Sequence, residues 1–274
     1  MSNTINSNSD IIRELRKKEE CQQLYANKIL CVSFWRIIRS DVIDKYLHQV
    51  YNVGKRDTVK KNINLINLLK TISKSIWQIL KLFFKKSKKI DHVFIAFPRL
   101  QKVSNLYLDK FTDPVIKYSA LTDNYLIFQR PLAGLHKKPR YNYQKIIITD
   151  FIEFFSKFFG AILLPFIQIY YFSLLYKTYK KAKTIFKINI KYLFLFGYKL
   201  TSFLISFSLY YIILKKISPK NVFVVSRELN YPILLACRKL NITSYEFQHG
   251  VTHTWTVLYS GKYDEGIDPD YFLS

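Results

Sequence analysis

Cysteine and glycine are both scarce in this chain, which has 3 cysteines and 7 glycines among 274 residues. The cysteines, Cys21, Cys31 and Cys237, form an odd set without a CxxC pair. Such a set is typical of reduced core thiols in a cytosolic protein, and it argues against a disulfide framework or a cysteine-based zinc site. The sequence also lacks a glycine-rich phosphate loop, a GxSxG nucleophile turn and paired zinc ligands. It therefore predicts neither a bound metal nor a resident cofactor.

Acidic residues are scarce as well, because 19 Asp and Glu stand against 43 Lys and Arg, which gives a formal net charge of +24. A charge of this size favours an anionic partner, which is a membrane surface, a nucleic acid or a phosphorylated substrate. The joint abundance of Lys, Asn, Ile, Tyr and Phe also fits a biased genomic base composition, so both explanations stay open. No nucleic-acid motif accompanies the charge, so we expect no nucleic-acid partner. The polar first ten residues argue against a secretory signal.

The apolar content predicts a folded α/β protein. Hydrophobic residues make up 49% of the chain and aromatic residues 17%, enough for a sizeable core. Several short runs are hydrophobic throughout and rich in β-branched and aromatic residues, as in a parallel sheet covered on both faces. We expect strands at 91–98, 125–128, 145–150, 221–225, 243–249 and 270–274, and helices at 11–24, 36–47, 65–84, 151–216 and 231–240. A turn is expected at 110–114, where Asp113 and Pro114 follow one another. The pattern predicts a Rossmann-like parallel sheet with a large helical insertion at 151–216.

Two long uncharged runs raise the question of membrane insertion. Residues 158–176 carry no charge over 19 positions, close to the roughly 20 that a spanning helix needs, whereas residues 200–214 give only 15. Gly160 and Pro165 interrupt the first run, and lysines and arginines flank both runs on both sides, so no positive-inside asymmetry orients them. We expect helices that are buried or lie against a membrane surface, rather than two spans.

The stretch Glu-Phe-Gln-His-Gly, Glu246 to Gly250, is the best candidate for a functional site. It ends a predicted strand, and ligands of open α/β sheets bind outside the carboxyl ends of the strands. Gly250 lets a ligand approach the backbone closely, and His249, with an ordinary pKa of about 6.5, suits a general base. Gln248 and His253 offer further polar contacts. A structural histidine at a strand end explains the pattern nearly as well, and both interpretations stay open.

Arg227 and Glu228 follow the predicted strand 221–225 and open the next helix, which places them at the same sheet edge as His249. Helix N-termini attract anions, so this turn is a candidate phosphate contact, although a solvated helix start has the same sequence. Tyr263 lies in a later loop dense in rings, hydroxyls and carboxylates, a composition typical of carbohydrate-facing surfaces.

Five short blocks resemble bacterial surface-polysaccharide proteins related to glycosyltransferases of the GT-B type, which has two Rossmann domains. They are Tyr245–Val251, Tyr259–Gly261, Pro269–Leu273, Phe34–Arg39 and Phe111–Val115. The resemblance implies a capsule or lipopolysaccharide sugar transferase that moves a sugar from a nucleotide-sugar donor to a lipid-linked or saccharide acceptor. It also implies a cytoplasmic protein, peripheral at the inner membrane and held there by the anionic membrane surface.

The resemblance further assigns roles to single residues and to the parts of the chain. His249 is the implied base or substrate contact, with Arg39, Gln248 and His253 in support. Residues 1–28 are then a polar tail and short helix, and 29–274 form the acceptor-side N-terminal domain. The C-terminal nucleotide-binding domain is expected to be absent, so a separate C-terminal half is an expected partner. The alternative function is that of a non-enzymatic, membrane-associated polysaccharide assembly protein, which the charge and the apolar runs favour.

Overall fold

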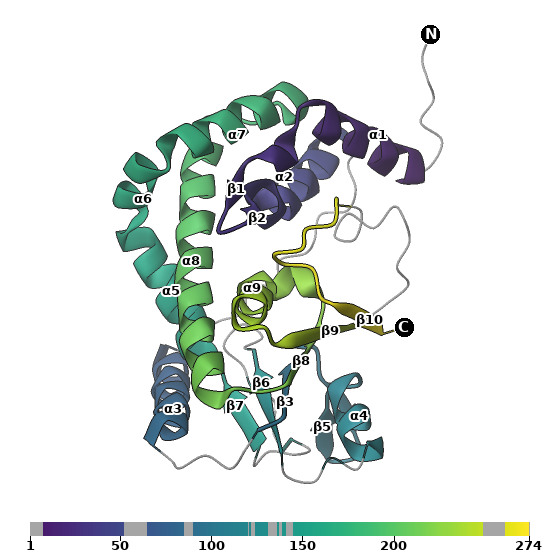
Figure 1. Cartoon of the computed structure of the whole chain (residues 1–274), viewed down its shortest axis with the longest axis vertical. Helices are drawn as coiled ribbons and strands as arrows, with labels where there is room; N and C mark the ends of the chain where they lie inside the picture. The colour runs from purple at the N-terminus through teal and green to yellow at the C-terminus, as the bar shows by residue number, and fades with distance from the viewer. Residues whose placement is uncertain are drawn as a thin grey trace. The chain divides into compact units, whose positions relative to one another are not determined.

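The computed structural model describes residues 8–51, 65–84, 90–119, 121, 124–130, 136, 139–140, 145–248 and 261–273. The chain packs as two compact units, which are described separately below. Unit 1 comprises Met1–Thr58, Phe158–Leu204 and Gly250–Gly266, and unit 2 comprises Val59–Lys157, Ile205–His249 and Ile267–Ser274. Each unit therefore combines three separate parts of the chain (Figure 1).

Unit 2 is built on a six-stranded, all-parallel sheet with the order β10-β9-β8-β3-β6-β7. Its strands are β3 (His92–Ala96), β6 (Tyr125–Gln129), β7 (Ile146–Ile148), β8 (Asn221–Val225), β9 (Thr243–Phe247) and β10 (Tyr271–Leu273). The expected α/β fold with a parallel sheet is confirmed. Numbered along the chain, the strands follow the order 3-2-1-4-5-6 of doubly wound Rossmann sheets. The direction of strand addition reverses between β3 and β8.

Helices cover one face of this sheet because each parallel connection must cross over it. Side chains from α5 (Asp150–Ile162), α8 (Lys191–Ile217) and α9 (Tyr231–Leu240) pack there. Ile152, Leu214 and Leu234 represent these three helices in a core that also contains Val93 and Val224 of the strands.

The opposite sheet face carries a row of aromatic rings. Phe94, Phe223, Tyr245 and Tyr271 are register partners on four neighbouring strands. Their rings stack with successive centroid distances of 4.7, 4.9 and 5.1 Å. Helix α4 (Thr112–Tyr118) packs on the same face through Ile116. The sheet pairing thus aligns aromatic residues that are far apart in sequence.

Two elements that follow β3 in sequence were not expected from the sequence. β4 (Gln101–Val103) and β5 (Leu106–Leu108) form an antiparallel hairpin. The expected turn at 110–114 is wrong, because α4 begins at Thr112 and holds Pro114 in its first turn. A proline is tolerated there because the first amide groups of a helix have no intrahelical acceptor.

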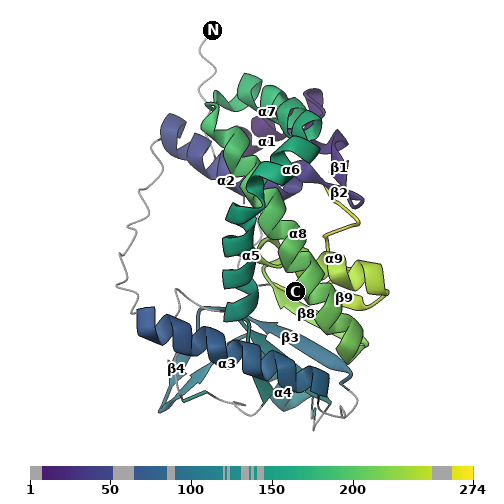
Figure 2. The same cartoon turned by 90° about the vertical axis from the view of Figure 1, so that its left-hand side faces the viewer.

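Helix α3 (Leu65–Phe84) confirms the expected helix and packs against edge strand β7. Figure 2 shows α3 in front of the sheet. The Gln78 side chain makes the two kinds of hydrogen bond that a neighbouring strand would make to β7. Its Nε2 donates to the Ile146 carbonyl at 3.1 Å, and its Oε1 accepts the Ile148 N–H at 3.0 Å. Ser75 Oγ donates to the Ile148 carbonyl at 2.6 Å and accepts the Phe151 N–H at 3.1 Å. These bonds satisfy backbone groups that a sheet edge otherwise exposes.

Unit 1 is a helical assembly with its own core. It contains α1 (Asn8–Cys21), the short helix η1 (Leu24–Ala26), the hairpin β1 (Lys28–Ile29) and β2 (Val32–Ser33), α2 (Phe34–Tyr51), α6 (Leu164–Tyr170), α7 (Phe172–Phe186) and part of α8. Ile12 and Leu15 of α1 are buried with Phe34 and Trp35 of α2. The Trp35 ring stacks on Phe186 of α7 at 5.5 Å. The first helix therefore contributes directly to a hydrophobic core.

The expected burial is wrong for two of the three cysteines, although all three are free thiols. Cys237 is buried in the unit 2 core, as expected, and burial raises its pKa above the ordinary value. Cys21 and Cys31 are exposed instead, because they lie at the end of α1 and in the β1–β2 turn, where the chain leaves the core.

One described helix, α8, is long and apolar enough to cross a membrane. Its most apolar window has a mean hydropathy of 1.4 and is 33% buried. Helices α5 and α6 pass the same test only as a pair, and they are bent by 65° relative to each other. The first uncharged run is thus divided among α5, α6 and α7 instead of forming one continuous helix. Length and composition alone do not distinguish a span from a core helix.

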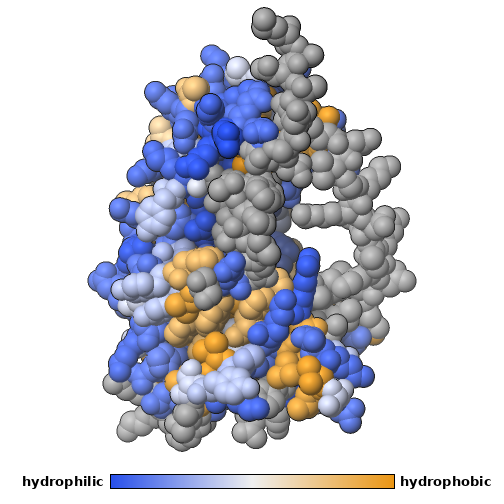
Figure 3. All heavy atoms as spheres, turned by 90° about the vertical axis from the view of Figure 1, so that its right-hand side faces the viewer, coloured by the Kyte–Doolittle hydropathy of each residue, from blue (hydrophilic) through white to orange (hydrophobic). Residues whose placement is uncertain are grey.

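Hydrophobic side chains also reach the surface of the molecule. They gather in the lower part of the face drawn in Figure 3, between hydrophilic areas. Edge strand β10 exposes Tyr271, Phe272 and Leu273. Helix α6 exposes Phe166, Ile169 and Tyr170, and α3 exposes a larger set described below.

Candidate functional site

The carboxyl ends of the parallel strands meet at one edge of the unit 2 sheet. The residues directly after β3, β6, β7, β8 and β9 are Phe97, Arg130, Thr149, Ser226 and Gln248. Ligands of open α/β sheets bind outside this edge, where the strand order reverses. In this chain the reversal lies between β3 and β8, so the turns after these two strands define the candidate site.

An open cleft of about 510 Å³ lies directly after β3. Its lining residues are Phe97, Arg99, Leu100, Gln101 and Lys110. The Lys110 ammonium lies 4.8 Å from the centre of the Phe111 ring, a cation–π geometry. The volume falls within the usual range of about 300–1,000 Å³ for ligand pockets. Two cationic side chains and an aromatic ring make this cleft suitable for an anionic ligand that also carries an apolar or ring-shaped part.

A buried carboxylate, Asp109, holds the wall of this cleft in place. It accepts the Phe97 N–H at 2.7 Å, the Phe111 N–H at 3.0 Å and the Thr112 hydroxyl at 2.9 Å. Burial raises the pKa of Asp109, while these donors act in the opposite direction. The network links the residue after β3 to the start of α4, and it therefore holds the two ends of the cleft lining together.

A second carboxylate, Asp113, lies beside the buried Arg140. Its Oδ2 accepts the Asp109 N–H at 2.7 Å and lies 3.2 Å from Arg140 Nη1. Burial raises the pKa of Asp113 to about 6, although the Arg140 charge lowers it. The block Phe111–Val115, which carries part of the resemblance, therefore contributes Phe111 and Asp113 to the hydrogen-bond network beside the cleft.

Arg227 lies in the turn after β8 among three buried carboxylates. Its Nη1 is 3.3 Å from Asp268 Oδ1, and its Nε is 3.8 Å from Glu246 Oε2 and 3.9 Å from Glu228 Oε1. Ser226, just before it, has a φ of 66°, and the Asn230 side chain fixes the turn by donating to the Val225 and Ser226 carbonyls at 3.0 Å. Three carboxylates around one guanidinium leave a local negative balance, which disfavours a phosphate at this turn.

Glu246 is a charged residue on the buried side of the motif strand β9. The alternation along β9 puts Ser244 and Glu246 on the buried side and leaves Tyr245 and Phe247 half-buried. Glu246 is fully buried and also accepts the Arg227 N–H at 2.9 Å. No role was predicted for Glu246 or Asp268 from the sequence. A glutamate at a strand position that alternation places on the buried side indicates a buried ion pair, because such residues are rarely buried unless paired.

A further pair at the same edge joins His136 and Asp150. His136 Nε2 lies 2.6 Å from Asp150 Oδ2, and both side chains are largely buried. Close by, the phenol of Tyr210 is near Thr149, Arg130 and Glu153, and burial raises its pKa. The Arg130 guanidinium donates to the Leu229 carbonyl in the turn after β8. Arg130 therefore connects the end of β6 to the turn at the switch point.

The remaining predicted site residues divide between the two units. Gln248 belongs to unit 2, where its N–H donates to the Leu273 carbonyl of β10 at 2.9 Å. His249, Gly250 and His253 lie outside the described residues. Their proposed roles stay predictions.

Arg39 and Tyr263 belong to unit 1. Arg39 is buried, and its Nε lies 2.7 Å from Oε1 of the fully buried Glu19. Tyr263 is 61% exposed. Its neighbour Lys262 accepts a hydrogen bond at its carbonyl from Arg36. Arg39 thus has the surroundings of a structural ion pair, whereas the Tyr263 ring is available at the surface.

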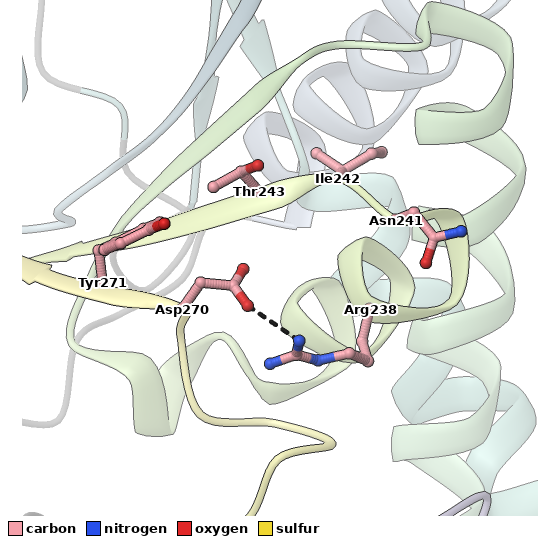
Figure 4. A pocket seen from close by; sticks show the side chains of 6 residues that line it. All are labelled: Arg238, Asn241, Ile242, Thr243, Asp270 and Tyr271. Carbon is pink, nitrogen blue, oxygen red and sulfur yellow. Dashed lines mark ion pairs between the residues drawn. The ribbon is translucent and has the colours of Figure 1, made fainter.

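A smaller cavity of about 250 Å³ lies at the opposite, amino-terminal end of β9 and β10 (Figure 4). Its charged residues, Arg238 and Asp270, pair with each other at 2.9 Å. Asp270 Oδ2 also accepts the Ser244 N–H and hydroxyl, both at 2.8 Å. These bonds fasten β10 to the sheet, and the paired charges leave little attraction for an ionic ligand.

Comparisons with known proteins add no family to this description. No protein-family model, curated protein or solved structure matches the chain. Within the described ranges, no group of three or more His, Cys, Asp and Glu side chains is placed to hold a metal ion.

Proposed function

We propose that the chain is the acceptor-side half of a GT-B-type glycosyltransferase of bacterial surface-polysaccharide biosynthesis. It transfers a sugar from a nucleotide-sugar donor to a lipid-linked or saccharide acceptor at the cytoplasmic face of an anionic membrane. A donor-binding half is the implied partner. The observation that carries this proposal is the position of the motif strand β9, whose carboxyl end lies at the same sheet edge as the basic cleft after β3.

The chemistry of the cleft supports this assignment. Nucleotide sugars and lipid-linked acceptors both carry phosphate, and Arg99 and Lys110 supply cations within one cleft. Phe97 supplies an aromatic surface next to them. In the sequence, His249 follows Gln248 directly after β9, so a general base is available two positions beyond the strand. A general base of this kind accelerates proton transfer by about 10²–10⁴-fold.

The decisive experiment measures sugar transfer. Membranes containing the chain are incubated with a panel of radiolabelled nucleotide sugars, with and without a separately expressed GT-B donor-binding half. Label is then counted in lipid-extractable and polymer fractions. We expect transfer from one donor class, and a loss of at least about 10²-fold in His249→Ala.

The matched control is His92→Ala. His92 opens β3 at the amino-terminal edge, where its Nδ1 lies 3.2 Å from Asn221 Nδ2. This variant removes a histidine from the amino-terminal edge of the same sheet, away from the proposed site, so transfer should persist. Equal activity of the two variants would remove His249 from the mechanism. An absence of transfer from every donor, with the donor-binding half present, would favour the non-enzymatic assembly protein.

A further inference from the structure

Helix α3 exposes an apolar stripe, in which Ser73 is the one polar position among the described residues. Six large hydrophobic side chains with exposed fractions between 40% and 84% form it: Leu65, Ile66, Leu69, Trp77, Leu80 and Phe84. At about 100° per residue, these positions fall within an arc of about 120° on the helix surface. The buried positions Ile72, Ser75 and Ile79 lie on a different arc, which faces the sheet. The stripe is thus a second apolar face that the fold of unit 2 leaves uncovered.

The stripe is held rigidly because the other side of α3 is bonded to β7. Gln78 and Ser75 together make four hydrogen bonds to backbone groups at 146–151. Rotation of α3 to bury the stripe would break all four. The apolar side chains therefore stay presented to whatever surrounds unit 2.

Basic residues border the stripe. Lys70, Lys74 and Lys81 are exposed and follow Trp77 around the helix, within about 60° of its position. The Lys81 ammonium lies 5.2 Å from the centre of the Trp77 ring. Residues 58–90 contain nine lysines and no aspartate or glutamate. The segment of sequence that carries the stripe therefore has only cationic charged side chains.

This charge pattern decides what covers the stripe. A second copy of the chain would bring two lysine borders together, and like charges in contact oppose association. An anionic lipid surface instead attracts the lysines while the apolar side chains enter the acyl boundary. Tryptophan is favoured at that boundary, because its ring is apolar and its N–H is polar.

We propose that α3 is a membrane-docking helix that lies in the interface of an anionic bilayer, with its exposed stripe inserted among the lipids. The proposal adds a defined docking element to the membrane location in the proposed function. Docking by α3 does not require glycosyl transfer, so the two proposals fail separately.

Vesicle binding of the full chain tests the docking. The probes are vesicles of phosphatidylcholine with phosphatidylglycerol and vesicles of phosphatidylcholine alone, with co-sedimentation as the readout. We expect strong binding to the anionic vesicles only, and an at least ten-fold weaker partition for Leu69→Ser/Trp77→Ser. Replacing Lys70, Lys74 and Lys81 by Gln should weaken binding by roughly five-fold per lysine, an effect that added salt suppresses in the wild type.

Two matched controls separate docking from general effects. Leu106→Ser/Tyr118→Ser removes two exposed apolar side chains of unit 2 that lie outside α3, and binding should not change. Trp77→Phe keeps the apolar area, so binding should persist while quenching of tryptophan fluorescence by brominated lipid falls. All exchanged side chains are exposed, so circular dichroism and thermal unfolding should report an intact fold.

Three results would overturn the proposal. The first is vesicle binding by Leu69→Ser/Trp77→Ser that equals the wild type. The second is loss of binding in Phe166→Ser/Ile169→Ser alone, which would assign insertion to the exposed face of α6. The third is a concentration-dependent dimer that Leu69→Ser/Trp77→Ser dissolves, in a protein that binds no vesicles.

Discussion

The buried carboxylate of Glu19 provides the sharpest test of how unit 1 is held together. Its side chain is fully buried and accepts three hydrogen bonds, from Tyr25 at 2.8 Å, Trp35 at 3.1 Å and Arg39 at 2.7 Å. Burial raises the pKa of Tyr25 to about 12, so the phenol stays a donor up to high pH. We predict that Glu19→Gln destabilises the protein strongly, because the side-chain shape is kept while the negative charge is lost.

The expected magnitude follows from leaving a buried guanidinium without this carboxylate. Breaking a buried ion pair by removing one partner costs about 3–5 kcal/mol. The lower end applies here, because Arg39 has further contacts. A loss of about 3 kcal/mol lowers the folded-to-unfolded ratio by roughly a hundredfold. Glu19→Gln/Arg39→Met removes both charges and should recover about 2 kcal/mol of this loss.

Urea unfolding, followed by circular dichroism and tryptophan fluorescence, measures these differences. Glu20→Gln is the control, because Glu20 is half-exposed and its charge lies 3.5 Å from Arg16 on the helix surface. Its effect should stay within about 0.5 kcal/mol. A loss of stability in Glu19→Gln no greater than that in Glu20→Gln would contradict the role of the buried ion pair. A loss in Glu19→Gln/Arg39→Met equal to the sum of both single losses would contradict it as well. In that second case, Arg39 and Glu19 contribute independently.

Two further variants test unit 2. Arg227→Ala should destabilise by about 3–5 kcal/mol, because it leaves Glu246 and Asp268 buried without the guanidinium. Unfolding at pH 7 measures this, and a loss below about 1 kcal/mol would contradict the structural role of Arg227. The pKa of Asp113 is raised to about 6 in the folded protein, against an ordinary value of about 3.9. Its contribution to the free energy of unfolding is therefore greatest below pH 4 and falls as the pH rises through 6. Asp113→Asn should therefore reduce the change in the free energy of unfolding between pH 4 and pH 7, by at most about 3 kcal/mol. The same pH dependence in the variant and the wild type would exclude Asp113 as the titrating group.

Much of the local structure could be predicted because it depends on neighbouring residues. The hydrophobic run at 221–225 is a strand, the pattern at 65–84 is a helix, and the run at 231–240 is a helix as expected. These segments carry their periodicity in the residues themselves. The turn expected at 110–114 is instead the start of α4, where Asp109 accepts the Phe111 N–H and the Thr112 hydroxyl. A proline is compatible with a turn and with the first turn of a helix, so Pro114 alone did not distinguish them.

The functional assignment of charged residues depended more on the fold. The resemblance implied a substrate contact for Arg39, and the helix start implied one for Arg227. Arginine pairs with phosphate and with carboxylate groups, so its presence fits either a ligand contact or an ion pair. The carboxylate nearest to each guanidinium is distant in sequence, 20 residues away at Glu19 for Arg39 and 41 residues away at Asp268 for Arg227. Local spacing gives no information on such pairs, so the sequence could not distinguish a structural cation from a ligand-binding one.

The sequence by itself determined the α/β class, the excess of positive charge and the motif at the end of β9, because composition and short periodicity require no knowledge of distant contacts. Only the tertiary structure decided the strand order, which places the cleft after β3 at the switch point. It also decided which side of α3 is buried. Both faces of that helix carry large apolar residues. The hydrogen bonds of Ser75 and Gln78 to β7, together with the burial of Ile72 and Ile79, leave the stripe with Trp77 outward.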